Sequence, residues 1–301
     1  MVYYINIGIG GKKLIKIISD SACDLPKEII EEYNIDILPI VVLKDEKEYL
    51  DKVSIDPIKV YAGMRNEEIY RTAQIPPSTF QEKFEEYAKN GETAIYLAFS
   101  SGLSGTYQTS VFVLESVMEK YPDFNLEIVD TKAASLGFGL IVYEAAKLAK
   151  EGKSKEEILK AVEFYLNNIE HIFTVDELEY LYRGGRVSRT QAFVGGLLNI
   201  KPILEVLDGK LVPLDKVRGK NNVYKKILDI MAERGKDADF SNQIIGISHG
   251  DDEKTALKLK ELIEERFGVK TFIVNIIGAA IGAHSGPGTL ALFFLRENYE
   301  D

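Results

Sequence analysis

The sequence is poor in the residues that form disulfide bonds and metal sites. It has one cysteine, Cys23, and three histidines, His171, His249 and His284, among 301 residues. A single cysteine excludes an intramolecular disulfide bond and favours a reducing compartment, so we expect a cytoplasmic protein. A lone cysteine with no histidine near it in the sequence is typical of a small buried thiol. No cysteine–histidine spacing matches a metal site, and we predict no bound metal.

Positive charge and long apolar runs are also scarce. The formal net charge is −10, which argues against nucleic-acid binding because neutralising phosphates requires a surplus of lysine and arginine. The same charge disfavours tight docking on anionic membranes, although a transient membrane contact stays open. No apolar run reaches the roughly 18 residues that a membrane-spanning helix needs. Residues 1–13 lack the basic segment and cleavage motif of a signal peptide, and we expect a loosely held N-terminal extension there.

Common catalytic signatures are missing as well. Ser104 lacks the glycine two positions later that a nucleophile elbow requires. The glycines near the N-terminus do not have the spacing of a phosphate-binding loop. No Gly-x-Gly-x-x-Gly fingerprint follows the first expected strand, Lys13–Ile18. Binding without catalysis, and without a cofactor, is therefore the simplest interpretation.

What the sequence does contain is an alternation of β-branched apolar runs with helical patterns. This alternation predicts an α/β fold with a parallel sheet. Strands are expected at Lys13–Ile18, Asp36–Leu43, Thr93–Phe99 and Leu126–Asp130, and helices at Asp56–Asn66, Thr79–Asn90, Tyr107–Tyr121 and Phe138–Glu151.

A second set of elements begins after Gly152. Asp208-Gly209 is a strong hairpin signal between two expected strands, Lys201–Leu207 and Lys210–Val217. Further strands are expected at His171–Thr174, Gln243–Ser248, Lys270–Ile276 and Leu290–Leu295, and helices at Ser154–Ile169, Asp176–Leu181, Gln191–Leu198, Asn222–Gly235 and Asp252–Phe267. We predict an N-terminal α/β domain at residues 14–165 and a C-terminal one at residues 166–301.

The most informative segment is a turn that follows a buried strand. The apolar run Ala94–Phe99 leads into Ser100–Thr106, which is rich in hydroxyls and glycine, and a helical pattern follows. Such a turn directs backbone N–H groups, hydroxyls and the positive end of a helix dipole to one place. The pattern predicts a site for an oxyanion such as a carboxylate, phosphate or sulfate.

Other loops share this composition. They are Ser19–Ser21, Thr72–Ser78 and Ile281–Gly288, the last with His284 among glycines. We favour a functional role for His284 and a structural one for His249. Arg183 and Arg186 in the Arg-Gly-Gly-Arg turn are suited either to clamping an anion or to pairing with carboxylates of the other domain.

These motifs, in this order, resemble the DegV family. The resemblance covers the chain from about residue 14 to its end, so it is nearly full-length. The matching segments are Ser19-Asp20-Ser21-x-x-Asp24-Leu25-Pro26, Thr72-x-Gln74-x-Pro76-x-Ser78, Ser100-Ser101-Gly102-Leu103-Ser104-Gly105-Thr106-Tyr107, Glu179-Tyr180-Leu181-x-Arg183-Gly184-Gly185-Arg186 and Ile277-Gly278-x-x-Ile281-Gly282-x-His284-Ser285-Gly286-Pro287-Gly288.

The resemblance implies a bacterial fatty-acid-binding protein, the binding subunit of a fatty acid kinase. It implies two α/β domains, an N-terminal Rossmann-like parallel sheet and a C-terminal mixed sheet with flanking helices, and a lipid site between them. The fatty-acid carboxylate would be held by Thr72 and Ser104 with His284 close by. The supporting residues expected around them are Ser100, Ser101, Gly105, Gln74, Ser285 and Arg186.

The sequence departs from the family at one loop, where Ala73 replaces the usual serine and Ile75 with a second proline stretches the run. The role of Thr72 survives this change, but any contact by the following hydroxyl is lost.

A palmitate- or stearate-like chain of about 16 to 18 carbons would gain roughly 0.8 kcal/mol per buried CH₂. We expect an apolar tunnel for it, lined from the segment that includes Phe193, Leu197, Leu198, Ile200 and Ile203, although each of these residues also suits an ordinary core.

The partners implied are the fatty acid and the ATP-binding subunit of the kinase. The alternatives are a hydrolase using Ser104 with His284, an enzyme acting on a small phosphorylated metabolite, and a purely structural or regulatory module.

Overall fold

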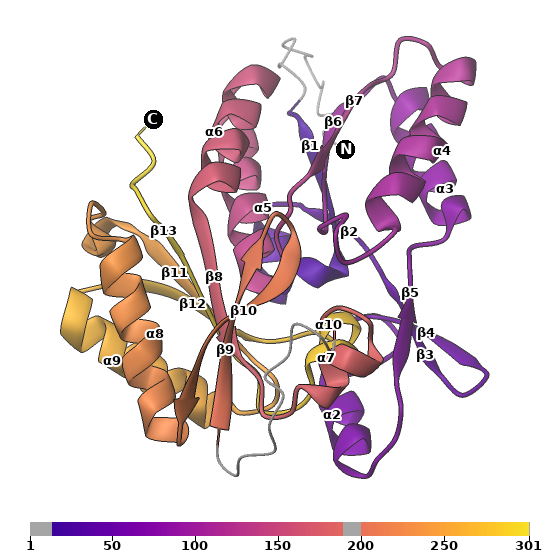
Figure 1. The fold of residues 1–301 in the computed structure, drawn as a ribbon. Coiled ribbons are helices and arrows are strands. Elements are labelled where there is room, and N and C mark those ends of the chain that lie inside the picture. Colours follow the sequence, from indigo (N-terminus) through magenta and orange to yellow (C-terminus); the bar gives the residue numbers. More distant parts are fainter. Residues whose placement is uncertain (1–13, 189–199, 301) are drawn as a thin grey trace, which may run out of the picture.

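The computed structural model describes residues 14–188 and 200–300, and Figure 1 shows their arrangement. The expected extension, residues 1–13, lies outside the described residues. Within those ranges the N-terminal sheet has the strand order β2-β1-β6-β7, and all neighbouring strands run parallel. Its strands are β1 (Lys16–Asp20), β2 (Asp36–Leu38), β6 (Thr93–Ala98) and β7 (Asn125–Asp130). The parallel sheet predicted for the N-terminal half is therefore confirmed.

Helices bury this sheet from both sides. Helices α3 (Pro77–Lys89) and α4 (Thr106–Lys120) lie on one face, and α5 (Ser135–Lys150) and α6 (Lys155–Asn168) lie on the other (Figure 1). The short helices η1 (Ser21–Cys23) and α1 (Lys27–Glu32) follow β1. Because both faces are covered, β6 reads as a continuous apolar run rather than an alternating one.

The expected strand at 36–43 is two strands rather than one. Pro39 has no N–H for a ladder, and the chain leaves the parallel sheet there. It continues in a small antiparallel sheet of order β4-β3-β5, with α2 (Pro57–Arg65) between β4 and β5 in the chain. The strands are β3 (Val41–Lys44), β4 (Lys47–Leu50) and β5 (Arg71–Ala73).

Strand β5 corrects the expectation of a loop at residues 71–79. Thr72 pairs with Val42, about thirty positions earlier, so the pairing that makes this segment a strand is not local.

The C-terminal sheet is mixed, in the order β10-β9-β8-β13-β11-β12, with only β11 and β12 running parallel as neighbours. The strands are β8 (Ile169–Thr174), β9 (Ile200–Leu207), β10 (Lys210–Arg218), β11 (Ile244–His249), β12 (Thr271–Ile276) and β13 (Leu290–Leu295). The hairpin at Asp208-Gly209 is confirmed, with both residues at positive φ as a tight two-residue turn requires.

Helices α8 (Lys220–Arg234) and α9 (Glu253–Phe267) cover one face of the mixed sheet (Figure 1). Their apolar sides form a core of their own with Ile172 and Ile203. The remaining short helices of the described C-terminal half are α7 (Glu179–Arg183), η2 (Phe240–Asn242) and α10 (Ala279–Ser285). Helix α10 corrects the interpretation of residues 281–288 as a simple loop, and the helix expected at 191–198 lies outside the described residues.

Helix α5 lies between the two sheets and is buried on nearly all sides. Two glycines allow this close packing. Gly137 leaves no room for a Cβ because His171 and Phe293 lie against it, and Gly139 faces the backbone of Cys23. A single large core therefore includes residues of both halves. The next helix, α6, begins with a capping box formed by Ser154 and Glu157.

The division into domains at residues 165 and 166 stays a prediction. Helix α6 ends at Asn168 and β8 begins at Ile169, so no loop separates the two elements.

Candidate functional site

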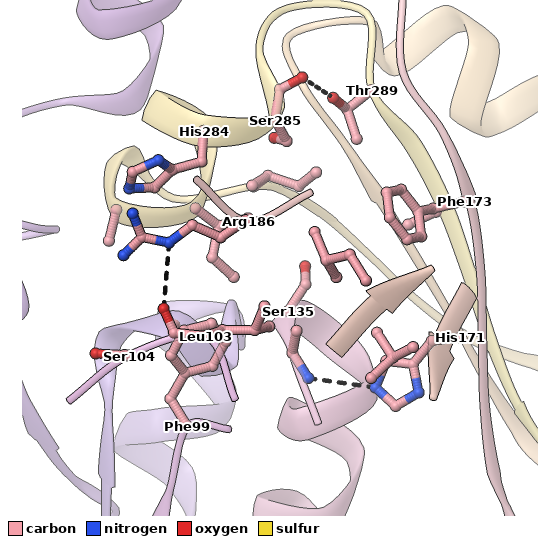
Figure 2. Close-up of a pocket in the computed structure, with 18 of the residues that line it drawn as sticks. Phe99, Leu103, Ser104, Ser135, His171, Phe173, Arg186, His284, Ser285 and Thr289 are labelled. Carbon is pink, nitrogen blue, oxygen red and sulfur yellow. Dashed lines mark hydrogen bonds between the residues drawn. The ribbon is translucent and has the colours of Figure 1, made fainter. Parts of the chain in front are cut away.

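An apolar cavity lies between the two halves of the protein. It borders about 800 Å³ of empty space, part of which is open to solvent. Its wall is mostly aliphatic and aromatic, and includes Phe99, Leu103, Phe173, Leu181, Ile277 and Phe293. Figure 2 shows Ser104, Arg186 and His284 on one side in that view, with Phe173 and His171 across from them. The cavity therefore has a polar side and an apolar side.

Thr72 and His284 meet at the polar side. Thr72 lies on β5 and His284 in the last turn of α10, and Thr72 Oγ1 lies 2.7 Å from His284 Nε2 although the residues are 212 positions apart. Gly184 makes room for the imidazole, because a side chain there would overlap the ring. Both residues line the cavity, so two of the three expected carboxylate-binding residues are brought together.

The environment keeps His284 neutral. Burial, together with the positive charges of Arg186 and Arg183, lowers the pKa of the imidazole to about 3. A neutral imidazole has one nitrogen that donates and one that accepts. His284 can therefore donate a hydrogen bond to Thr72, but it brings no positive charge of its own.

Ser104 also lines the cavity, at the turn before α4. Its Oγ lies 2.9 Å from Thr106 Oγ1 and accepts a hydrogen bond from the Thr106 N–H. The next residue, Gly105, lies directly against the side chain of Gln74, which leaves no space for a Cβ. Gln74 thus packs the segment that carries Thr72 onto the turn that carries Ser104. Gln74 and Gly105 therefore support the site indirectly, by holding these two segments together.

Ser100 and Ser101 stabilise the turn through hydrogen bonds to other segments. The Ser100 hydroxyl donates to Gly209 O at 2.7 Å, which ties the turn to the hairpin between β9 and β10. Lys132 Nζ donates to Ser101 Oγ at 2.6 Å. Neither serine is among the residues that line the cavity. Their expected support of an anion is therefore indirect, through the shape of the turn.

Ser285 and Arg186, the other two supporting residues that we expected, line the cavity. Ser285 is 5% exposed, and its Oγ has no hydrogen-bond partner among the described residues. Arg186 Nε donates to Leu103 O at 3.2 Å, and its NH1 bonds to Gly184 O. Arg183, in contrast, lies over the ring of Tyr180. The cavity wall therefore presents a free hydroxyl and one anchored guanidinium.

The other candidate residues have structural roles. Asp20 accepts hydrogen bonds from the N–H groups of Ala22 and Phe99, and Ser21 Oγ accepts one from Ile40 N. His249 Nδ1 accepts one from Asp252 N, in agreement with the structural role expected for it. Cys23 is buried, and desolvation raises its pKa to about 12, so the thiol is inert as expected.

Of the five residues expected to line a tunnel, the structure describes two, Ile200 and Ile203, and neither lines the cavity. Ile203 packs in the core beneath α8 and α9, on the other side of the mixed sheet, and Ile200 is not among the lining residues. Phe193, Leu197 and Leu198 lie outside the described residues. The lining comes instead from β8 and β13, through His171, Phe173, Ala291 and Phe293. Alternate residues of the two strands face the cavity, but the sequence has no signal for which of the two faces lines it, because β13 is apolar at every position.

His171 is the main polar residue that the sequence did not indicate for this site. Its Nε2 accepts a hydrogen bond from Ala134 N at 3.3 Å (Figure 2). Burial lowers its pKa to about 4, so it is neutral near pH 7. It therefore forms part of the uncharged wall.

Two further findings concern metal binding and membrane-spanning helices. Within residues 14–188 and 200–300, no group of three or more His, Cys, Asp and Glu side chains is arranged to hold a metal ion. Among the helices in the same ranges, none has the length and apolar character needed to cross a membrane.

Fold and cavity together define an α/β protein with a parallel and a mixed sheet and an internal apolar site between them. Comparison with known proteins gives the same class. A family model described as "Uncharacterised protein, DegV family" matches residues 14–297. A DegV domain-containing protein of Clostridium perfringens is 43% identical over 287 residues, which cover 94% of this chain and 98% of the relative. The chain belongs to the DegV family.

Solved structures share the fold across nearly the whole chain. A protein from Thermus thermophilus described as a fatty-acid-binding DegV protein has a TM-score of 0.84 at 29% identity, covering 93% of this chain and 99% of that one. A stearic-acid-binding protein from Eubacterium ventriosum has a TM-score of 0.86 at 26% identity, with 94% and 98% covered. DegV from Bacillus subtilis, also described as fatty-acid-binding, has a TM-score of 0.83 at 29% identity, with 94% and 99% covered.

Proposed function

We propose that this protein binds a long-chain fatty acid, with the acyl chain in the apolar cavity and the carboxylate at Thr72, Ser104 and His284. The observation that carries the proposal is the Thr72–His284 pair at the polar side of an otherwise apolar cavity. The described binding of fatty acids by relatives with the same fold supports it.

The tail supplies most of the binding free energy. An acyl chain of about 16 carbons gains roughly 0.8 kcal/mol per buried CH₂, more than 10 kcal/mol before the costs of association and ordering are subtracted. The walls around Phe173 and Phe293 suit such a chain because they offer no charge. Affinity then depends chiefly on the tail, and the head group fixes its orientation.

The carboxylate needs donors, because burying it without partners costs several kcal/mol. Neutral His284 donates its Nε2–H to Thr72 Oγ1 in our proposal, which leaves the Thr72 O–H free to donate to the ligand. The hydroxyl of Ser104, in the turn before α4, and that of Ser285, at the end of α10, supply further donors. Arg186 provides a positive charge on the same wall and favours the ionised acid.

The bound acid is presented to a separate ATP-dependent fatty acid kinase, and this chain itself is not an enzyme in our proposal. The sequence has no phosphate-binding loop, which is consistent with a partner that binds ATP. The geometry also disfavours a Ser104–His284 hydrolase, because His284 Nε2 is bonded to Thr72 and Ser104 is bonded to Thr106. The protein would act in the cytoplasm as a carrier.

Mass spectrometry of lipids extracted from the purified protein tests this function. The expected result is one acyl chain per protein, with rebinding after delipidation. Ser104→Ala should weaken rebinding of a fatty acid but not of the corresponding primary alcohol. A preparation that neither carries nor rebinds a fatty acid would refute the proposal, as would ester hydrolysis that Ser104→Ala abolishes.

A further inference from the structure

A second, polar cavity lies on the other face of strand β8. Side chains alternate along a strand, and His171 and Phe173 line the apolar cavity. Thr174 therefore points the opposite way, toward α8 and α9, where it lines a cavity bordering about 290 Å³ of empty space. The two cavities are separated by the thickness of the mixed sheet.

Thr174 is the first sign of a ligand there. The residue is 6% exposed, and its Oγ1 has no hydrogen-bond partner among the described residues. Leaving a buried hydroxyl unpaired costs about 1–3 kcal/mol, so such groups in folded proteins are normally satisfied by water or a ligand. Because Thr174 is one of the residues that line the cavity, a group bound there would complete the bonding of its hydroxyl.

Two lysines on different elements border the same cavity. Lys201 Nζ lies 2.7 Å from Asp176 Oδ1, and Lys220 Nζ lies 2.9 Å from Asp252 Oδ2. An ammonium group has three N–H donors, and one carboxylate oxygen uses one of them. Each lysine can thus keep its aspartate and still donate into the cavity.

The start of α8 adds a third source of positive potential. Helix α8 begins at Lys220, and its N-cap, Gly219, has φ 83° and no side-chain cap. Helix α9 differs, because the Asp252 carboxylate caps it by accepting from Thr255 N. The N-terminus of α8 is therefore the one that still favours an added negative group.

We propose that this cavity, defined by Thr174, Lys201, Lys220 and the N-terminus of α8, binds an oxyanion the size of phosphate. The free donors are a hydroxyl, two ammonium groups and helix N–H groups, and all of them suit an acceptor-only ligand. A cation is disfavoured because each nearby aspartate is already paired, and no metal-binding group of three is present in the described part of the chain. The inference does not depend on the proposed lipid function.

Titration calorimetry with inorganic phosphate tests the site on the full chain. Thr174→Val should weaken phosphate binding about tenfold, as expected for loss of one hydrogen bond to a charged group, and Thr174→Ser should restore it. Lys220→Met should weaken it by about tenfold or more. Lys226→Met is the matched control, because Lys226 lies on the same helix but pairs with Asp215 and does not line the cavity.

No measurable phosphate binding by the unaltered protein overturns the proposal. Equal losses for Lys220→Met and Lys226→Met overturn it as well, since they indicate general electrostatics. If Thr174→Val does not fold, the comparison of the two lysine variants still decides. Fatty-acid rebinding should be unchanged in all four variants, which separates failure of this site from failure of the lipid site.

Vesicles distinguish a lipid phosphate from a free one. Phosphatidylcholine vesicles with and without phosphatidic acid are sedimented with the protein and with Lys220→Met. Binding that needs both phosphatidic acid and Lys220 identifies a head group as the source. Phosphate binding in calorimetry without sedimentation identifies a free oxyanion, and the absence of both contradicts the site.

Discussion

Two polar clusters connect the same two halves of the protein, and they differ in how fully their groups are bonded. In the first, which we term the Asp24 cluster, Asp24 accepts from Ser135 Oγ at 2.6 Å and from Gly278 N at 2.8 Å, and Lys52 Nζ lies 3.5 Å away. In the second, Thr72 and His284 bond to each other and face a cavity. The first cluster is complete without a ligand, whereas the second keeps donors available.

This difference indicates a division of labour. A buried charge with all its partners stabilises one arrangement of the chain, and losing one partner is costly. The Thr72–His284 pair costs less to leave without a ligand, because neither the hydroxyl nor the neutral imidazole carries a full charge. We therefore expect the Asp24 cluster to control stability and the Thr72–His284 pair to control binding.

The largest effect should come from Asp24→Ala. The change leaves the buried N–H of Gly278 without its acceptor and removes the carboxylate that pairs with Lys52. We expect a loss of about 3–5 kcal/mol in the free energy of unfolding, measured by urea denaturation. Glu31→Gln, in an exposed pair with Lys27, serves as the control and should cost less than about 0.5 kcal/mol. Similar losses in the two variants would erase the distinction between buried and exposed pairs.

The second largest effect is expected in the pH dependence of stability. Burial raises the pKa of Asp20 from 3.8 to about 7, although hydrogen bonds from Phe99, Ala22 and Tyr96 act in the opposite direction. Between these values the folded protein binds more protons than the unfolded chain, so stability falls as the pH rises from about 4 to about 7. The decline should be on the order of a few kcal/mol.

Asp20→Asn should flatten this decline. Urea midpoints at about pH 5 and about pH 8 provide the measurement, since Asp20 is fully buried and its titration is felt by the whole fold. A variant with the same slope as the unaltered protein would place the responsible group elsewhere, for instance at Asp24, whose pKa burial raises to about 6.

A change in the apolar wall should alter selectivity with a moderate effect. Ala291 lines the cavity from β13, and Ala291→Leu fills part of the space with three more carbons. We expect affinity for an 18-carbon acid to fall about tenfold, with little change for a 12-carbon acid, because the longer tail loses burial. Competition binding with a series of chain lengths measures this. Equal loss at every length would mean that the tail does not reach β13.

Of the variants in the two polar clusters, Thr72→Val should have the smaller effect on stability, because it keeps the shape of the side chain and removes only the hydroxyl. Fatty-acid affinity should fall about tenfold because a charge-assisted hydrogen bond is lost, while the free energy of unfolding changes by about 1 kcal/mol. Thr72→Ser should retain binding. A large loss of stability with unchanged binding would reverse the roles assigned to the two clusters.

Local patterns predicted much of the fold. The turn after β6 and the Asp-Gly hairpin were both evident, because each depends on a few adjacent residues with strong conformational preferences. The short strand β5 was missed, since Thr72 is a strand residue only by pairing with Val42. The same holds for α10, whose glycines obscured a helix packed against α2.

The sequence predicted the polar residues of the candidate site better than its apolar lining. Thr72, Ser104, Arg186, His284 and Ser285 all line the cavity, whereas Ile203 faces the opposite core. Which face of the mixed sheet a strand residue takes depends on register against distant strands, and a one-residue shift reverses it. Periodicity indicates that a side chain is buried, but not on which side.

The residues alone indicated most of the order of strands and helices, the polar turn after β6 and the membership of the DegV family. Only the tertiary structure decided that Thr72 meets His284 across 212 positions and that α5 is enclosed by both sheets. It also decided that Thr174 turns away from the apolar cavity into a polar one. Local preferences act over a few bonds, whereas these contacts depend on how distant segments pack, which no short pattern encodes.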